Sequence, residues 1–404
     1  MTSRRSFIQR AGALAGAGVL HGLAGSPALA ADADASLPER IRRELLVPPG
    51  KNYLNTGSLG PSPRAVLDTV VDAMWTLERD PVSENWGRLG QQMEAVRKKV
   101  ADFIHADVRE VLLTRNTTEG LSLICQVMPL KAGDEIVTTT LEHGGGEVGL
   151  EYLVKSRGAT LKKVELPLLP ESKEEVVSVI ERSLTPATKV LMLSHVNTIT
   201  GLLMPLAEIS TITKARGIFL LVDGAQTPGL MPVDVKAIGA DAYASSGHKW
   251  LLGPKETGFL YVKSGFPGSV PPVFALYGSD AYTQSSGTRN VATIMGLGAA
   301  IDWHTSLGIE ATANYCLSLR NECYRRLKQV KGVRMLSPEN PALSTGIVSF
   351  EIPQLKNGEI YARLREQNVI VKVLPQHNGI RISCHVFVSS ADIDQFITLL
   401  TAIA

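Results

Sequence analysis

A single lysine stands in an otherwise uncharged stretch of the sequence, "SSGHKWLL". Lys249 follows Ser-Ser-Gly-His and precedes Trp-Leu-Leu. Lysine is usually a solvated surface residue, so a lysine in these surroundings needs either an ion-pair partner or a chemical task. A lysine amine can bond covalently to an aldehyde and can also move a proton. Covalent catalysis is therefore the chemistry that this residue would perform.

A carboxylate precedes this lysine by about one strand. Asp223 closes the strongly apolar segment "GIFLLVD", and Lys249 follows it 26 residues later. A carboxylate at the end of a buried strand is costly unless it meets a cation or a good hydrogen-bond donor. Ligands of open α/β sheets bind at the carboxyl ends of the strands, so we expect both residues to lie at such an edge.

Hydroxyl groups follow an earlier strand. Thr117 and Thr118 in "TRNTTEGL" lie where a strand turns into a helix, so they face any anion bound at the positive end of that helix. Ser246 and His248, beside the lysine, can supply further donors. An anion cradle, a buried carboxylate and an isolated lysine together predict a pyridoxal phosphate site, in which the aspartate keeps the pyridine nitrogen protonated.

Each of these residues alone also has a simpler interpretation. Asp223 and Lys249 could form a structural ion pair, and His143 could be an ordinary histidine in a glycine-rich turn. Thr117 and Thr118 could do no more than cap a helix. The complete set in this order favours the cofactor site over these alternatives.

The elements that must position these residues alternate along the chain. Seven short apolar runs indicate strands, and helix-length amphipathic stretches separate several of them: "EVLLTRN", "EIVTTTLE", "TLKKVELP", "TKVLMLSHV", "GIFLLVDGAQ", "AYASSG" and "TGFLYVK". This order predicts an α/β fold, with a mostly parallel sheet that is covered by helices on both faces.

Four segments are expected along the chain. Residues 1–30 are a targeting segment, 31–65 an N-terminal arm, 66–275 a large cofactor-binding domain, and 276–404 a smaller C-terminal α+β domain. We expect one long helical stretch after "GTRN" that runs through Arg326, and the arm near "KNYLNTGSLGPSP" should pack against the small domain.

Composition excludes several classes of function. The net charge of the 404 residues is +2 and basic residues form only short clusters such as "RR", so neither nucleic acid nor an anionic membrane surface is an expected partner. Four cysteines, at positions 125, 316, 323 and 384, show no metal-binding spacing and predict buried free thiols. No metal site is expected.

The N-terminus resembles a twin-arginine export signal. Arg4 and Arg5 precede Phe7, a mildly apolar stretch follows, and Ala28-Leu29-Ala30 is typical of a cleavage site. The resemblance implies recognition by the twin-arginine export machinery, cleavage near Ala30, and a periplasmic or secreted protein. An ordinary secretion signal or a short buried helix are the alternatives. No other segment approaches about 18 uninterrupted apolar residues, so no stable membrane insertion is expected.

From "YLNTGSLGP" to "IRISCHVFVSS", the chain resembles class V aminotransferases of the fold-type I pyridoxal-phosphate group, which also contains cysteine desulfurases and isopenicillin N epimerase. The resemblance implies that Lys249 bonds to the cofactor, Asp223 contacts the pyridine nitrogen, Gln226 contacts the ring hydroxyl and His143 stacks on the ring. Phosphate contacts are implied for Thr117, Thr118, Ser246 and His248. It also implies a homodimer, in which Thr288 of "SSGTRN" contacts the phosphate across the interface.

Substrate recognition is implied at two further positions. Arg381 in "GIRIS" matches an arginine that grips the α-carboxylate of the substrate, a bidentate task that suits a guanidinium. Asn55 in "YLNTG" is the second substrate-binding residue that we expect.

Differences between this sequence and the family's desulfurases limit the reactions that we expect. Cysteine desulfurases need a nucleophilic cysteine upstream of the carboxylate-binding arginine, and no cysteine lies between Ser349 and Arg381. Cys384 follows that arginine inside a predicted strand. Thr198 stands where many desulfurases carry an asparagine. We therefore expect an aminotransferase that acts on an amino acid or on an amino-acid-bearing secreted metabolite. An epimerase or a β-eliminating lyase is the alternative, and a non-catalytic binding protein is the outside alternative.

Overall fold

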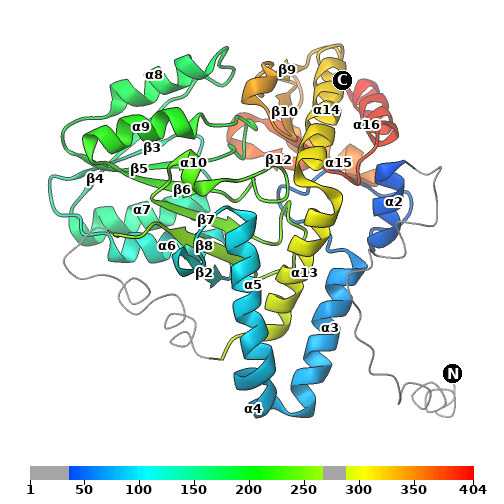
Figure 1. The fold of residues 1–404 in the computed structure, drawn as a ribbon. Coiled ribbons are helices and arrows are strands. Elements are labelled where there is room, and N and C mark those ends of the chain that lie inside the picture. The colour runs from blue at the N-terminus through cyan, green and yellow to red at the C-terminus, as the bar shows by residue number, and fades with distance from the viewer. Residues whose placement is uncertain (1–35, 267–287) are drawn as a thin grey trace, which may run out of the picture. The chain divides into compact units, whose positions relative to one another are not determined.

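A seven-stranded sheet forms the centre of the structure, a computed structural model that describes residues 36–266 and 288–404 (Figure 1). The strand order is β2-β8-β7-β6-β5-β3-β4. In this sheet β8 runs antiparallel to both of its neighbours, and the other paired strands are parallel. The strands are β2 (Val111–Thr114), β3 (Glu135–Thr139), β4 (Thr160–Val164), β5 (Thr188–Ser194), β6 (Phe219–Asp223), β7 (Ala242–Ser246) and β8 (Gly258–Val262). The predicted α/β class and mostly parallel sheet are confirmed.

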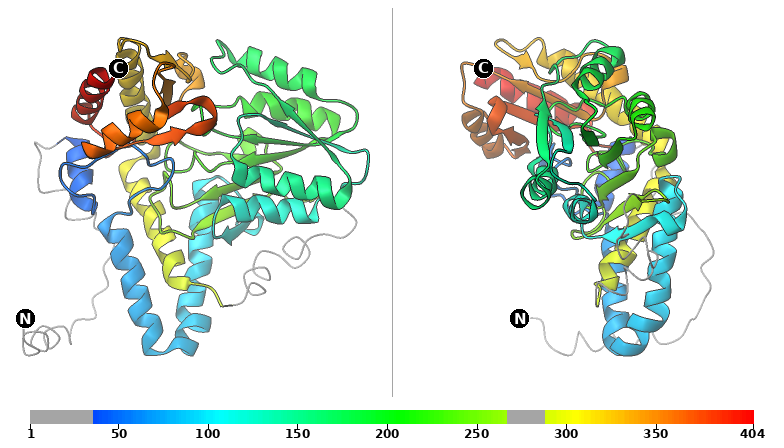
Figure 2. Two further views of the ribbon diagram at one scale, coloured as in Figure 1. Left: turned by 180° about the vertical axis from the view of Figure 1, so that it is seen from behind. Right: turned by 90° about the vertical axis from the view of Figure 1, so that its left-hand side faces the viewer.

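Helices cover both faces of this sheet (Figure 2). One core joins Met192 of β5 and Leu221 of β6 to α6 and α7, whereas the alternate residues Leu193 and Val222 pack in a second core with α8 and α9. Because both faces are buried at the centre of the sheet, β5 and β6 are almost continuously apolar, whereas the edge strand β4 is partly exposed and carries two lysines. The helices are α6 (Thr117–Val127), α7 (Gly144–Arg157), α8 (Lys173–Ser183) and α9 (Leu206–Arg216), with the short α10 (Val235–Ile238) and 3-10 helix η3 (Val108–Glu110).

A helical hairpin leads into the sheet. Helices α3 (Arg64–Arg79) and α5 (Leu89–Phe103) are joined by α4 (Pro81–Ser83) and the π-helical turn η2 (Glu84–Arg88), and α13 (Val291–Leu307) packs against both. The expected single helical stretch to Arg326 is wrong in one respect. It consists of α13 and α14 (Ile309–Leu327), because Gly308 between them has a φ of 80°, which ends the helix.

A four-stranded antiparallel sheet, in the order β12-β13-β10-β9, follows in the C-terminal part of the chain. Helices α14, α15 and α16 share its apolar core, in which Phe350, Ile382 and Phe396 are fully buried. The elements are β9 (Arg334–Met335), η4 (Pro341–Leu343), β10 (Ile347–Glu351), α15 (Asn357–Glu366), β11 (Val369–Ile370), β12 (Lys372–Leu374), η5 (Pro375–His377), β13 (Gly379–Ser383) and α16 (Ser390–Ile403).

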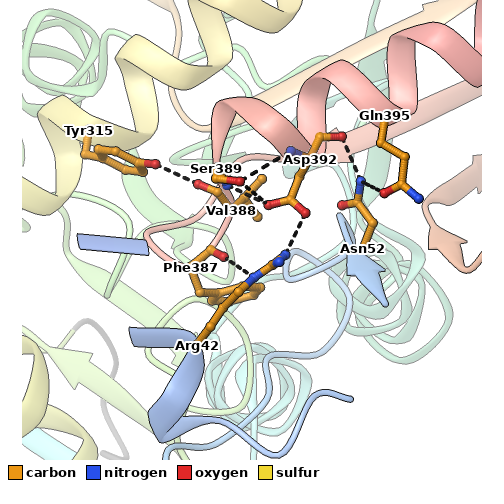
Figure 3. Close-up of polar contacts among 8 residues, drawn as sticks. All are labelled: Arg42, Asn52, Tyr315, Phe387, Val388, Ser389, Asp392 and Gln395. Atoms are coloured by element: carbon orange, nitrogen blue, oxygen red, sulfur yellow. Dashed lines mark hydrogen bonds and ion pairs between the residues drawn. The ribbon is translucent and has the colours of Figure 1, made fainter. Parts of the chain in front are cut away.

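The N-terminal arm docks on this C-terminal part (Figure 3). Strand β1 (Asn52–Tyr53) pairs in parallel with β11, and α2 (Leu37–Glu44) precedes it. Arg42 Nη2 donates to Asp392 Oδ1 at 2.8 Å and Arg42 Nε to the Phe387 carbonyl at 2.9 Å. Asn52 Nδ2 donates to the Asp392 carbonyl at 2.7 Å. These contacts fix the start of the loop that continues through residues 54–60.

The predicted signal, residues 1–30, lies outside the described residues, and so does the predicted domain boundary at 275. The four-segment division therefore stays a prediction. Among the described residues, no helix is both long and apolar enough to cross a membrane.

Removal of the arm's anchor should destabilise the fold. Arg42→Ala deletes a charge-assisted hydrogen bond to the largely buried Asp392, so we expect the free energy of unfolding to fall by about 1 to 3 kcal/mol. Lys98→Ala is the control, because its ion pair with Asp102 is exposed and contributes about 0.5 kcal/mol or less. Urea denaturation monitored by circular dichroism measures both, and equal losses would contradict the anchoring role.

Candidate active site

A cavity of about 800 Å³ opens at the carboxyl ends of the parallel strands. Asp223 is the last residue of β6, Ser246 the last of β7, and Thr117 the first of α6. The small sheet closes the cavity through β12 and Arg381 of β13. Nine predicted site residues line it: Thr117, Thr118, His143, Asp223, Gln226, Ser246, His248, Lys249 and Arg381.

Lys249 and Asp223 occupy this cavity without forming an ion pair. Asp223 is 6% exposed, and its Oδ1 accepts the Ala225 backbone N–H at 2.9 Å. Among the described residues, no carboxylate lies within 4.0 Å of the Lys249 amine. Burial lowers the pKa of Lys249 to about 8, and the negative charge of Asp223 partly opposes this effect. The amine is therefore poised to act as a nucleophile, which the ion-pair interpretation does not explain.

Several hydrogen-bonding groups gather at the N-terminus of α6. Asn116 caps the helix through its side-chain oxygen, so the interpretation of Thr117 or Thr118 as a cap is wrong. The Thr117 N–H donates to Ser246 Oγ at 2.9 Å, and their two hydroxyl oxygens lie 2.7 Å apart. His248 Nδ1 is buried without a partner. Hydroxyls, a helix N-terminus and an unused ring nitrogen form a donor set that fits a phosphate.

His143 is held by its own helix. It is the N-cap of α7, and its Nδ1 accepts the Gly145 N–H at 3.0 Å. In the neutral ring the proton is consequently on Nε2. Burial, followed by the charge of Lys249, lowers the pKa of His143, which keeps the ring neutral near pH 7. The contact with the Gly145 N–H orients the imidazole within the glycine-rich turn, and stacking of the ring on the cofactor stays a prediction.

Arg381 is a buried cation whose partners are neutral. The residue is 2% exposed, its Nε has no partner, and burial lowers its pKa to about 10. The acceptors of its remaining donors are the Thr198 carbonyl at 3.0 Å, Thr198 Oγ1 at 2.7 Å, Asn55 Oδ1 at 3.3 Å and Ser58 Oγ at 3.1 Å. Since a buried cation without a counter-ion is costly, this guanidinium is suited to bind a ligand anion.

Asn55 and Gln226 have contacts that the sequence did not reveal. Asn55 reaches the site by contacting Arg381. Gln226 Nε2 donates to the Gly57 carbonyl at 2.9 Å and to Thr198 Oγ1 at 3.0 Å, and its Oε1 accepts from Trp250 Nε1 at 2.7 Å. Both amide hydrogens are in use, so the predicted contact with a ring hydroxyl requires an exchange of one of them.

Thr288 is exposed and does not line the cavity of its own chain. Its predicted role depends on a second subunit and stays a prediction.

Glu142 is a site residue that the sequence analysis missed. It is 9% exposed, and its carboxylate accepts hydrogen bonds from Thr139 Oγ1 at 2.7 Å, from Ser194 Oγ at 2.6 Å and from the Ser194 N–H at 3.0 Å. Burial raises its pKa to about 7, and the nearby charge of Asp223 adds to this effect. Its place directly before His143 at a strand end was the available signal.

The cysteines lie away from this chemistry. All four are free and buried, as predicted, and none lines the cavity. Burial raises the pKa of Cys125 to about 12, so its thiol is protonated. Cys384 directly follows β13 rather than lying within it. In the described part of the chain, no group of three or more His, Cys, Asp or Glu residues could hold a metal ion.

Comparison with known proteins agrees with this geometry. The family model for aminotransferase class-V matches residues 53–396. The chain belongs to the aminotransferase class-V family. It is 29% identical to isopenicillin N epimerase of Streptomyces clavuligerus, over 90% of this chain and 98% of that protein. It is 32% identical to a cysteine desulfurase of Yersinia pseudotuberculosis, over 79% of this chain and 82% of that protein.

Solved structures show the same fold. C-DES carrying a Lys-to-Ala substitution, with glycine linked covalently to its pyridoxal phosphate, superposes with a TM-score of 0.80 at 24% identity, over 89% of this chain and 98% of that chain. The complex of the cystine C–S lyase C-DES with cysteine persulfide gives 0.79 at 25% identity, over 87% and 97%. The fold is fold-type I, and the cofactor of this class V enzyme is pyridoxal phosphate.

The residues present fit that cofactor. Lys249 would bond to its aldehyde, Asp223 would face its ring nitrogen, and the donors around α6 would hold its phosphate. When bound, the cofactor draws electrons away from the α-carbon of an amino acid, which makes the α-proton acidic.

Glu142 predicts a specific pH dependence of stability. Its raised pKa means that the folded chain retains a proton that the unfolded chain has lost, between the ordinary pKa of 4.5 and about 7. The stability that the protonated carboxyl contributes is present below pH 4.5 and is lost as the pH rises through 7. We expect the unfolding free energy of the wild type, relative to Glu142→Gln, to fall by on the order of 2 to 3 kcal/mol across this range.

Urea denaturation at a series of pH values measures this difference. Glu174→Gln, on the exposed side of α8, controls for the loss of a surface carboxyl. A difference between the wild type and Glu142→Gln that stays constant with pH would contradict the assignment.

Proposed function

We propose that this protein is a pyridoxal-phosphate-dependent aminotransferase that acts on the α-amino group of an amino acid. The observation that supports this most is the buried guanidinium of Arg381, which has no carboxylate partner and lines the same cavity as the Lys249 amine. An amino acid carries both groups that these residues suit: its α-carboxylate would bind the Arg381 guanidinium, and its α-amino group would lie near the Lys249 amine.

The chain's own residues divide the work. Arg381 binds the α-carboxylate through its unpartnered Nε–H and through one Nη2–H that gives up its contact with Ser58 or Asn55, while Thr198 holds the guanidinium in place. The Lys249 amine, whose pKa is lowered to about 8, takes the α-proton and returns it. Asp223 supplies a fixed negative charge that would keep the ring nitrogen of the cofactor protonated.

Transamination needs a single proton carrier, which Lys249 provides. Epimerisation needs a second carrier, because a proton that leaves one face of the α-carbon must be replaced from the other face. His143 is the observation that keeps an amino-acid epimerase as the second candidate, since its Nε2 proton belongs to an oriented ring in the same cavity. The similarity to isopenicillin N epimerase over 98% of that protein supports the same candidate.

Desulfuration through a protein persulfide is disfavoured by the thiols. The four cysteines are buried and lie outside the cavity, so none can attack a substrate sulfur there.

Export and assembly complete the proposal. We place the mature protein in the periplasm or outside the cell, on the basis of the twin-arginine-like segment with Ala28-Leu29-Ala30, and we propose a homodimer in which Thr288 serves the partner's site. An amino acid or a secreted metabolite with a free amino-acid head is the corresponding substrate.

Absorption spectra of the cofactor-loaded protein test the reaction. The protein is mixed with a panel of L- and D-amino acids without a keto acid, and keto acid release and the chirality of the remaining amino acid are measured. Stoichiometric conversion of the cofactor with release of one keto acid per site supports the aminotransferase. Inversion of chirality without keto acid release supports the epimerase. No reaction with any amino acid would contradict both and favour a binding protein.

Lys249→Ala should abolish turnover without unfolding the chain. The amine acts covalently and as the proton carrier, so we expect a loss of at least about 10³-fold in kcat. Removal of a buried amine should leave the unfolding midpoint equal to or above that of the wild type. Lys263→Ala, an exposed lysine paired with Asp241, is the matched control and should keep full activity. Retained turnover in Lys249→Ala would refute the assignment.

A further inference from the structure

Two cations face each other across a strand pair at the mouth of the site. In the register of β12 and β13, Lys372 lies directly opposite Arg381. Opposite residues of an antiparallel pair project from the same face of the sheet, with Cα atoms about 5 Å apart. Like charges in this position destabilise a sheet. Their juxtaposition is therefore costly unless negative charge binds beside each of them.

The same row of side chains faces the cavity. On the other side of Arg381, the opposite residue is Ser349 of β10, and its hydroxyl donates to the Ile199 carbonyl at 2.5 Å. Arg381 donates to the neighbouring Thr198. Since the row packs on the segment after β5, Lys372 continues it toward the cavity, which it lines together with Arg381 and Thr198.

The other charges of the cavity do not neutralise Lys372. Glu147 is paired with Lys163 at 2.7 Å, the charge of Asp223 acts on the Lys249 amine, and the carboxyl of Glu142 is hydrogen-bonded to Thr139 and Ser194. Lys372 is exposed, and no ion pair holds it in the described part of the chain. Lys372 lines the same cavity as His143 and Arg381. The buried Arg381 and the exposed Lys372 thus both remain without an anionic partner among the described residues.

We propose that Lys372 binds a second carboxylate of the substrate, so that the enzyme prefers amino acids with an acidic side chain. This inference rests on the proposed function, because it takes the α-carboxylate to occupy Arg381. The buried guanidinium suits the carboxylate of fixed geometry that is common to all amino acids. The exposed lysine is a flexible point charge that suits a carboxylate at the end of a side chain.

Calorimetric titration of the cofactor-loaded protein tests the inference without turnover. Glutarate and its monoamide glutaramate have the same length and lack an amine, so they bind without reacting; succinate and succinamate form a shorter pair. For the wild type, we expect whichever of glutarate and succinate binds more tightly to exceed the affinity of its monoamide roughly tenfold. In Lys372→Met this preference should disappear, while the affinity for the monoamide stays within about twofold of the wild-type value. Lys331→Met, an exposed lysine outside the cavity, should keep the preference.

Equal affinities of the wild type within both pairs, or a preference that survives in Lys372→Met, would overturn the inference. A joint loss of monoamide and dicarboxylate affinity in Lys372→Met would also overturn it, because both cations would then bind one carboxylate.

Kinetics with L-glutamate against L-glutamine, and L-aspartate against L-asparagine, separate this inference from the proposed function. Turnover of the amides with KM values equal to those of the acids contradicts the acidic-substrate inference alone. Absence of turnover with every amino acid contradicts the proposed function, whereas the titrations still decide whether Lys372 binds a carboxylate.

Discussion

The exclusion of water from cationic side chains is the constraint on which the rest of the structure depends. Lys249 and Arg381 come from different sheets and meet in one cavity, where burial lowers the pKa of both. Neither has a carboxylate in direct contact within the described residues. Such groups are costly unless fixed dipoles, a nearby charge or a ligand replaces the lost water. The fold supplies fixed dipoles to Arg381 through neutral oxygens and a nearby negative charge to Lys249 through Asp223. The cavity leaves room for a ligand.

The N-terminal arm makes this arrangement possible. It is tied to the C-terminal part of the chain through Arg42, Asp392 and strand β1, and it then enters the site between the two sheets. A Cβ at Gly60 would lie 2.2 Å from the Lys249 carbonyl oxygen, and one at Gly57 would lie 2.9 Å from Gln226 Oε1 and 3.0 Å from Arg381 Nη2. Only glycine allows the approach to backbone at residue 60, and a side chain at residue 57 would have to displace the ends of Gln226 and Arg381. The arm therefore forms a wall of the cavity.

The sequence predicted the parts of the site that belong to strand ends. Apolar runs located the strands, and polar residues directly after them, such as Asp223 and Ser246, had to meet at one edge of a parallel sheet. Lys249 was recognisable because a lone lysine among apolar and small residues is unusual. These signals are local, and the resemblance to the family added Arg381.

What the sequence did not reveal depends on contacts between distant segments. The neutral surroundings of Arg381 arise from residues 55, 58 and 198, and its pairing with Lys372 depends on strand register. The buried state of Glu142 depends on Ser194 of the neighbouring strand region. Gly308 and the Asn116 cap are local signals that the sequence analysis did not use. Glycine favours the positive φ that ends α13, and an asparagine side chain readily caps a helix such as α6.

Mapping the covalent attachment of the cofactor tests the central claim most directly. The cofactor-loaded protein is reduced with borohydride, digested and analysed by mass spectrometry. We predict one phosphopyridoxyl group per chain, on the peptide that contains Lys249. Attachment at another lysine, or no attachment when the cofactor is in excess, would contradict the claim that this cavity is a pyridoxal phosphate site organised around Lys249.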